Sequence, residues 1–282
     1  MRTFPRMLRL EMAKLFGRPL FSVGLVVLAV VMALFYLLFF LFRSNIPASG
    51  TRFLYWPDSL IYGLGYASGY ASWTSYGTYL LIVLVGVGTA QEYSWRTLQL
   101  WLGHGIGRRT VLSAKFAVSL LPAVVIVVVC LVVVGAVSAV FSLADHGTVG
   151  VGKVHADALL VGALRTLYSM LPYAALTFFV AVVTRSTVLA VAGGIGFVAV
   201  LETALLQTLP HLGGTLDRVV QFLPGGLSSA LNAQNAAIAG VAPITAGDQP
   251  SALVAAIGIG IYTVILCGLA VLVFERQDLT QA

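Results

Sequence analysis

The chain has 282 residues, of which 59% are hydrophobic and 9% charged, and its mean hydropathy is +0.98. Soluble domains are about half apolar and about a quarter charged, so this composition excludes an ordinary soluble enzyme or binding module. The formal net charge of +6 comes from 16 Lys and Arg residues against 10 Asp and Glu residues, and anionic lipid accounts for it without a nucleic-acid partner.

The chain begins with a basic segment, residues 1–19, in which apolar residues recur at roughly helical spacing. This pattern predicts a helix lying in the membrane interface, although a simple positively charged flank would fit it equally well. The uncharged run 20–42 follows. It exceeds the roughly 20 residues needed to cross the hydrocarbon core and is longer than the apolar stretch of a signal peptide, so we expect a retained membrane span.

The remaining chain contains five further apolar runs of membrane-spanning length. We expect these spans at 66–90, 116–141, 164–183, 187–209 and 252–274. The sequence therefore predicts an all-α integral membrane protein with six transmembrane helices, folded as a single transmembrane domain over residues 1–282. Between the last two spans, residues 210–251 are too apolar for a free loop, and we expect short helices half-buried at the outer face.

Aromatic residues recur at spacings of three and four where the second span begins, and on a helix they would form one stripe. We take four of them as candidates for the wall of a substrate conduit: Tyr66, Tyr70, Trp73 and Tyr76. Aromatic rings suit an amphipathic substrate because they combine apolar area with polar tips. An interfacial belt or simple helix packing would produce the same stripe, and both interpretations stay open.

Between the second and third spans lies a charged segment, residues 91–115, in a chain that is otherwise poor in charge. Residues 93–102 are predicted to form a short amphipathic helix, which a glycine-rich stretch then ends. An ordinary cytoplasmic loop would also carry cations and interfacial tryptophan, but it has little need of such a helix and hinge. We interpret the segment as a docking surface for a soluble partner. Its candidate residues are Glu92, Arg96, Leu98, Trp101, Arg108, Arg109 and Lys115.

The Lys and Arg residues are distributed unequally between the two sides that six spans define. Eleven of the 16 fall on the side that holds both termini and segment 91–115, and five fall on the other side. Cytoplasmic flanks carry the excess of positive charge. We therefore expect a multi-pass protein of the plasma membrane with both termini in the cytoplasm.

Glu202 is the one carboxylate within an expected span, in its outer half. An ionisable group in a membrane is costly, and this cost makes a functional role the default interpretation. Glu202 would then belong to the transport route or to its outer gate. A protonated side chain that is hydrogen-bonded to a neighbouring helix is an equally acceptable interpretation.

No motif for covalent chemistry is complete. The stretch Gly147–Val154 has the glycine and lysine spacing of a phosphate-binding loop, but Val154 stands where a hydroxyl should bind magnesium. The histidines lie outside the apolar runs, and no His-Glu-x-x-His motif or other known metal-ligand template occurs. We expect no catalytic residue, no metal and no bound cofactor in this chain.

In the order of these features the sequence resembles the permease subunits of type-2 ATP-binding cassette (ABC) exporters. Their second loop typically has an acidic residue, a Gly-Thr-Leu-like start, an apolar helix, an Arg element and a lysine. Glu92, Thr97-Leu98, Arg109 and Lys115 follow that order here. Trp95-Arg96 replaces the usual glycine.

The start of the chain resembles the same family, with Leu8, Glu11, Lys14 and Arg18-Pro19 in the pattern that opens many members. The resemblance implies an N-terminal interfacial helix, a cytoplasmic coupling helix and a separate ABC ATPase subunit that binds ATP and Mg. It adds Glu11 and Lys14 to the residues that couple to the ATPase. A second permease chain, identical or similar, would complete the conduit for a hydrophobic or amphipathic substrate such as a drug, lipid or peptide.

Three other classes of protein are alternatives, and it is the resemblance, rather than hydropathy alone, that favours the exporter permease over them. A stand-alone secondary transporter or channel would use Glu202, but such proteins favour several intramembrane charges or broken helices. A membrane-embedded enzyme lacks its catalytic pairs here. A membrane anchor or sensor of a larger assembly neither requires nor excludes six spans.

Overall fold

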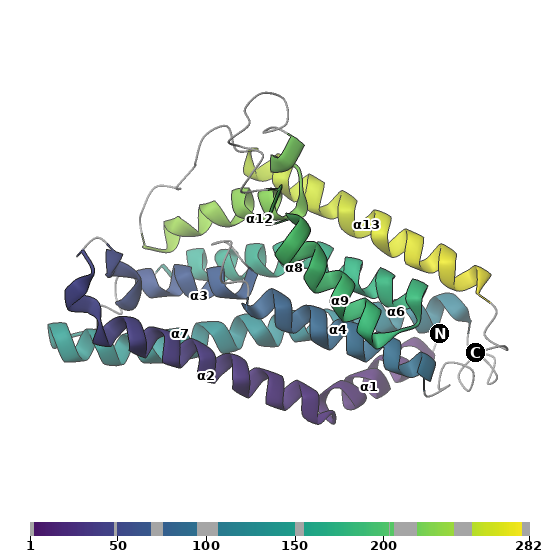
Figure 1. Ribbon diagram of the computed structural model, residues 1–282, viewed down its shortest axis with the longest axis horizontal. Helices are drawn as coiled ribbons and strands as arrows, with labels where there is room; N and C mark the ends of the chain where they lie inside the picture. Colours follow the sequence, from purple (N-terminus) through teal and green to yellow (C-terminus); the bar gives the residue numbers. More distant parts are fainter. Residues whose placement is uncertain are drawn as a thin grey trace.

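The structure, a computed structural model, describes residues 3–47, 50–68, 76–94, 107–149, 155–202, 204–205, 219–239 and 250–277. Within these residues the chain is helical and contains no strand. Its long helices run roughly along the long axis of the molecule (Figure 1). The helices are α1 (Thr3–Phe16), α2 (Pro19–Leu41), α3 (Asp58–Ser68), α4 (Tyr76–Ser94), α6 (Arg108–Ser119), α7 (Leu121–His146), α8 (Ala156–Thr184), α9 (Thr187–Gly196), α12 (Pro224–Asn232) and α13 (Ala252–Arg276).

Shorter turns extend or connect these helices. A π-helical turn, η5 (Phe197–Glu202), continues α9, and a 3-10 turn, η7 (Ala233–Ala239), continues α12. Two further 3-10 turns, η1 (Arg43–Asn45) and η3 (Arg52–Leu54), lie between α2 and α3. Pro122 stands in the first turn of α7, where proline is tolerated, so α6 and α7 follow one another with only Leu120 between them.

Four helical stretches among the described residues are long and apolar enough to cross a membrane. They are Pro19–Leu41, Arg108–His146, Ala156–Thr184 and Ala252–Arg276. A shorter apolar helix covers Thr187–Glu202, within the expected fifth span. Of the expected second span, 66–90, the described residues are the last turn of α3, up to Ser68, and those of α4 from Tyr76 onward, while 69–75 lie outside the described part of the chain. The structure is therefore that of an all-helical membrane protein.

α3 is packed closely against other helices. It lies against α7 and α8 inside the bundle, and eight of its residues are buried. A β-carbon at Gly63 would lie 3.3 Å from Cβ of Val134, so the two backbones approach as closely as small residues allow in membranes. Gly63 therefore permits close contact between the two helices. Glycine is less apolar than the residues of a lipid-facing span, so it interrupts the continuous apolar run by which such a span is recognised.

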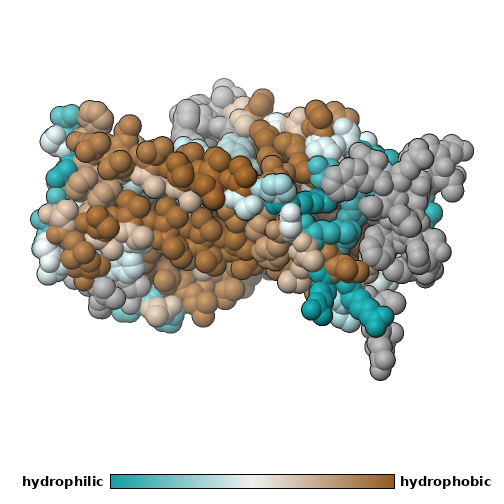
Figure 2. All heavy atoms as spheres, turned by 90° about the horizontal axis from the view of Figure 1, so that it is seen from below, coloured by the Kyte–Doolittle hydropathy of each residue, from teal (hydrophilic) through white to brown (hydrophobic). Residues whose placement is uncertain are grey.

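α8 is the central helix, packed against α4, α9, α12 and α13. The outside of the bundle is apolar: Figure 2 shows a broad hydrophobic band with hydrophilic side chains at its ends. On α2 the band includes Val23, Val26, Val30, Leu34 and Leu38, all at least half exposed. A soluble protein rarely exposes so large an apolar surface, whereas lipid covers it favourably.

The segment before α13 is partly buried. Within the expected outer segment 210–251, the described residues 219–239 form the end of one short helix, α12 and η7. Leu227 and Leu231 of α12 pack with Ala255 and Ile259 of α13 in a small apolar cluster. Residues 210–218 and 240–249 lie outside the described residues.

Several helix ends meet at one end of the molecule, which we name the charged end. α1, the C-terminal end of α4, the start of α6 and the end of α13 all lie there (Figure 1). The side-chain amide of Gln277, just after α13, donates to the carbonyl of Val182 in the last turn of α8 at 2.7 Å. The turn from α8 to α9 is tight, with Arg185 in the left-handed conformation and the Ser186 side chain capping α9.

Candidate functional site

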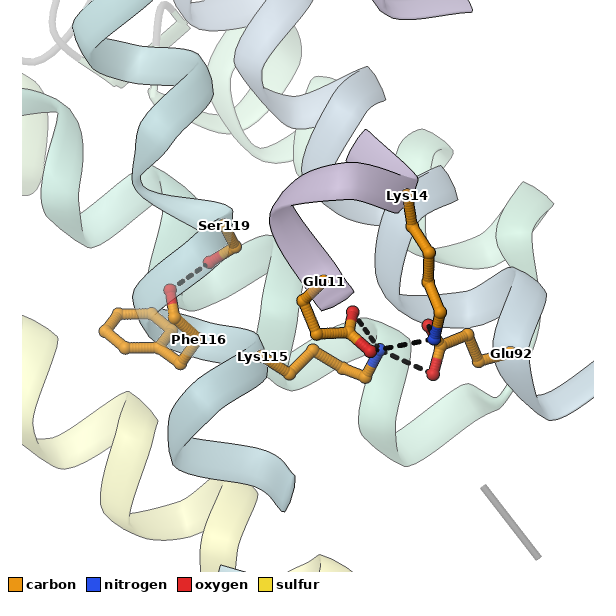
Figure 3. Close-up of polar contacts among 6 residues, drawn as sticks. All are labelled: Glu11, Lys14, Glu92, Lys115, Phe116 and Ser119. Atoms are coloured by element: carbon orange, nitrogen blue, oxygen red, sulfur yellow. Dashed lines mark hydrogen bonds and ion pairs between the residues drawn. The ribbon is translucent and has the colours of Figure 1, made fainter. Parts of the chain in front are cut away.

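Four buried or half-buried charges from three helices meet at the charged end. Lys14 Nζ of α1 lies 2.9 Å from Glu11 Oε1 and 3.2 Å from Glu92 Oε1 of α4. Lys115 Nζ of α6 lies 3.1 Å from Glu11 Oε2 and 2.6 Å from Glu92 Oε2. Each carboxylate therefore pairs with both ammonium groups, and the four side chains form a closed ion-pair ring (Figure 3).

The ion-pair ring is largely shielded from solvent. The side chains of Glu92, Lys115 and Glu11 are 2%, 6% and 8% exposed, whereas Lys14 is 33% exposed. Two negative and two positive groups cancel, so the ring needs no counter-ion. A buried charge that loses its partner costs several kcal/mol, which makes the completeness of the ring important for stability.

The neighbouring charges favour the ionised forms of Glu11 and Lys14. Burial opposes ionisation of Glu11, but Lys115 and Lys14 outweigh it and lower the pKa of Glu11 below its ordinary value. Burial likewise disfavours the charged form of Lys14, but the carboxylates of Glu92 and Glu11 raise its pKa. Both shifts favour the charged pair at neutral pH.

Helical spacing positions the ring. Glu11 and Lys14 are three residues apart on α1 and therefore share one face, which also buries Met7 one turn earlier. Phe4 and Leu10 of α1 are partly exposed. α1 packs against α6, which brings Glu11 to Lys115 although 104 residues separate them in the chain.

The start of α6 is joined to the end of α13. Arg108 donates from Nη1 to the carbonyl oxygens of Phe274, Glu275 and Gln277, at 3.3, 2.9 and 2.9 Å. Carbonyls at a helix C-terminus have fewer backbone partners than those inside the helix, and a cation there also interacts favourably with the helix dipole. Arg109 forms an ion pair with the Glu275 carboxylate at the surface.

Some of the predicted docking residues contact one another in the structure, and others lie outside the described residues. Glu92, Lys115, Glu11 and Lys14 contact one another, and Arg108 and Arg109 contact α13. Arg96, Leu98 and Trp101 lie outside the described residues. The docking role of this set stays a prediction. The pairing of Glu92 with Lys115 was not foreseen, although two acidic and two basic residues beside apolar spans were a signal for it.

The predicted conduit residues that are described lie in an aromatic cluster. The rings of Tyr66 and Tyr76 are 6.3 Å apart and nearly parallel, and Tyr66 also meets Phe35 and Tyr36 of α2 edge-on. Tyr66 is 7% exposed. Tyr70 and Trp73 lie outside the described residues. The cluster is packing between α2, α3 and α4, and whether a substrate passes beside it stays a prediction.

Glu202 is buried at the end of the π-helical turn η5, 3% exposed. Its carboxylate accepts a hydrogen bond from the Tyr173 hydroxyl of α8 at 2.9 Å and another from the backbone N–H of Gly225 in the first turn of α12. The side chain therefore joins three elements: η5, α8 and α12. Its polar partners satisfy it within the bundle, and π-turns frequently occur at functional sites.

The described residues contain no group of three or more His, Cys, Asp or Glu side chains that could hold a metal ion. Of the glycine-rich stretch Gly147–Val154, residues 150–154 lie outside the described part of the chain. Gly147 itself has a positive φ of 70° and ends α7, which is the usual role of glycine after a helix.

A family model described as ABC-2 family transporter protein matches residues 77–279, from the first turn of α4 to just beyond the end of α13. No curated protein matched the chain. The matched region includes Glu92 and Lys115 of the ion-pair ring, as well as Glu202.

Proposed function

Because the chain belongs to the ABC-2 family of transporter proteins, we propose that it is the permease subunit of an ATP-driven exporter. It would work with a separate ABC ATPase, which binds ATP and Mg, and this chain would catalyse no covalent step. Two permease chains, identical or merely similar, would enclose a conduit for a hydrophobic or amphipathic substrate. Six spans would place both termini and segment 91–115 in the cytoplasm.

The ion-pair ring is the observation that carries this proposal. Glu92 and Lys115 stand at the two ends of segment 91–115, and the ring joins them to each other and to α1. A force applied to the segment between them would therefore reach α1, α4 and α6 together. Arg108 extends the connection to the end of α13 through its backbone carbonyls.

We assign two kinds of role to the predicted docking residues. Glu11, Lys14, Glu92 and Lys115 hold the ends of the segment in place, since their charged groups face one another. Arg96, Leu98 and Trp101, with Arg108 and Arg109 beside them, would provide the contact with the ATPase. Rigid-body movement of packed helices would then transmit ATP-driven closure of the ATPase to the conduit.

The conduit would run beside Tyr66, Tyr70, Trp73 and Tyr76, with Glu202 toward its outer end. A stand-alone secondary transporter or channel is the second candidate, and the buried Glu202 carboxylate favours it, since such groups mark ion and proton routes in membranes. The two functions differ in their energy source. Only the first requires a soluble ATPase.

Affinity purification in mild detergent tests the proposal. We expect the full-length chain to retain a soluble ATPase in a fixed ratio, and Arg96→Ala and Trp101→Ala to reduce that ratio. Arg52→Ala is the matched control, because Arg52 is a 68% exposed cation in η3, far from segment 91–115 in the chain. Purification of the chain alone, together with solute movement in liposomes without ATP, would refute the exporter and favour a transporter that uses Glu202.

A further inference from the structure

The C-terminal ends of α13 and α8 are each capped by a side chain from outside the helix. Arg108, the first residue of α6, donates from Nη1 to the carbonyl oxygens of Glu275 and Gln277 at the end of α13, both at 2.9 Å. Gln277, the first residue after α13, donates in turn from Nε2 to the carbonyl oxygen of Val182 at 2.7 Å. Val182 lies in the last turn of α8.

We propose that these two caps form a relay, which we name the capping relay, and that Gln277 is the positioning residue through which segment 91–115 sets the position of α8. The ion-pair ring connects the segment to α1, α4 and α6, and the capping relay adds α13 and α8. The relay itself needs no ATPase, whereas its use in transport rests on the proposed exporter function.

Gln277 contacts two separate parts of segment 91–115. Its backbone carbonyl accepts from Arg108, where α6 begins. Its side-chain oxygen Oε1 accepts from the hydroxyl of Tyr93, near the start of the segment, at 3.5 Å. The same amide group therefore faces Tyr93 with its oxygen and Val182 with its nitrogen. One residue links α4 and α6 to the end of α8.

The hydrogen bonds at the end of α8 show why the Gln277 amide matters there. The carbonyl groups of the last turn of a helix have few backbone donors within reach. The N–H of Arg185 donates to the carbonyl of Ala181 at 3.0 Å, and the N–H of Ser186 donates to the Thr184 hydroxyl at 3.4 Å. The carbonyl of Val182 receives its hydrogen bond from Gln277 instead. A shift of Gln277 would leave a polar group of α8 without its donor, which is costly in a part-buried position.

The part of α8 that the relay reaches also holds Glu202. Pro172 interrupts the backbone hydrogen bonds of α8, since proline has no N–H to donate to the preceding turn. The stretch 173–184 follows it and begins with Tyr173, whose hydroxyl donates to Glu202 at 2.9 Å. Tyr173 and Val182 are nine residues apart, about 14 Å along the helix. A movement imposed at Val182 would therefore be carried along this stretch to Glu202 and through its carboxylate to α12.

Hydrogen exchange of the full-length chain in detergent, with any co-purifying subunit left in place, tests the relay. The reporter is a peptide covering residues 180–186, because the N–H of Arg185 makes the capping bond at the end of α8. Gln277→Ala should raise its exchange rate about five-fold, the effect of losing one hydrogen bond. Arg108→Ala should raise it too, although Arg108 bonds to α13, because Gln277 then loses its own support.

The double variant separates a relay from two independent contacts. If Arg108 acts through Gln277, Arg108→Ala should add nothing to the exchange rate of Gln277→Ala. Gln277→Glu keeps the size of the side chain and the acceptor for Tyr93 but lacks the amide N–H, so it should match Gln277→Ala. Arg276→Ala is the matched control, an exposed cation beside Gln277, and should leave the exchange rate unchanged. All variants should elute as single peaks in size exclusion.

Three results would overturn the relay: unchanged exchange in both Gln277 variants, no effect of Arg108→Ala, or additive effects in the double variant. Addition of ATP to the complex with a co-purified ATPase tests its use in transport. ATP should change the exchange of the reporter peptide in the wild type but not in Gln277→Ala, with equal amounts of ATPase bound. A change that persists in Gln277→Ala would overturn the coupling role. Absence of an ATPase would count against the exporter function, and the double variant would still decide the relay.

Discussion

Neutralising one member of the ion-pair ring should destabilise the protein strongly. Glu92→Gln removes the charge that faces both Lys14 and Lys115, at 3.2 and 2.6 Å, from a side chain that is 2% exposed. Glu11 alone would then compensate two ammonium groups, of which Lys115 is 6% exposed. Breaking a buried ion pair from one side costs about 3–5 kcal/mol. In a chain of this size 1 kcal/mol corresponds to about 2 °C, so we expect the melting temperature to fall by about 6–10 °C.

Thermal unfolding of the purified protein in detergent measures this effect. Glu275→Gln is the matched control, the same chemical change at the same end of the molecule, in a carboxylate that pairs with Arg109 at the surface. The melting temperature of this variant should stay close to that of the wild type, because exposed ion pairs contribute little. Equal effects of Glu92→Gln and Glu275→Gln would refute the reasoning.

Three further predictions concern other parts of the molecule. The pKa of Glu11 is lowered in the folded protein, so its contribution to stability should be complete above about pH 4.3 and should be lost as the pH falls through the folded pKa. The pKa of Lys14 is raised, so its contribution should be complete below about pH 10.4 and should be lost as the pH rises through the folded pKa. Melting temperatures from pH 3 to pH 11 check this, and Glu11→Gln should lose the acid-side dependence. Gly194→Ala should cost about 1–3 kcal/mol in chemical unfolding, because its β-carbon would lie 2.6 Å from Ile82 Cγ2, whereas Gly268→Ala meets nothing within 4 Å and should be neutral. Tyr173→Phe and Glu202→Gln should each increase amide exchange at the start of α12, because the first removes a hydrogen-bond donor from the carboxylate that joins α8 to Gly225 and the second leaves one acceptor oxygen where there were two. Unchanged exchange in both variants would contradict that connection.

The sequence predicted the family and the helical membrane class, because both depend on features that can be read along the chain. α13 begins at residue 252, where the predicted span begins, since an uninterrupted apolar run follows the capping side chain of Ser251. The burial of α3 was not predicted, because it depends on contact with α7 and α8, which are distant in the sequence. Hydropathy detects lipid-facing helices better than helices buried among their neighbours.

The sequence identified the residues of the site but did not predict which of them contact one another. Glu92 and Lys115 were identified as flanks of one segment, and a surface role was the simplest interpretation of charge beside an apolar span. Their pairing depends on α1, which is 78 residues distant at Lys14 and 104 residues distant at Glu11. No pattern in a single sequence reports which distant charges meet. The burial of the ring is a property of the packed helices.

Because the chain is synthesised from the amino terminus, the four charged residues of the ring are made in a fixed order: Glu11 and Lys14 first, Glu92 later and Lys115 last. A nascent chain that has not reached Lys115 holds two carboxylates against one ammonium group, with its last partner missing. The ring can therefore close only when α6 has been made and has packed against α1. Closure marks the completion of this end of the protein during biogenesis, and a chain that stops earlier carries an uncompensated acidic group that the membrane disfavours.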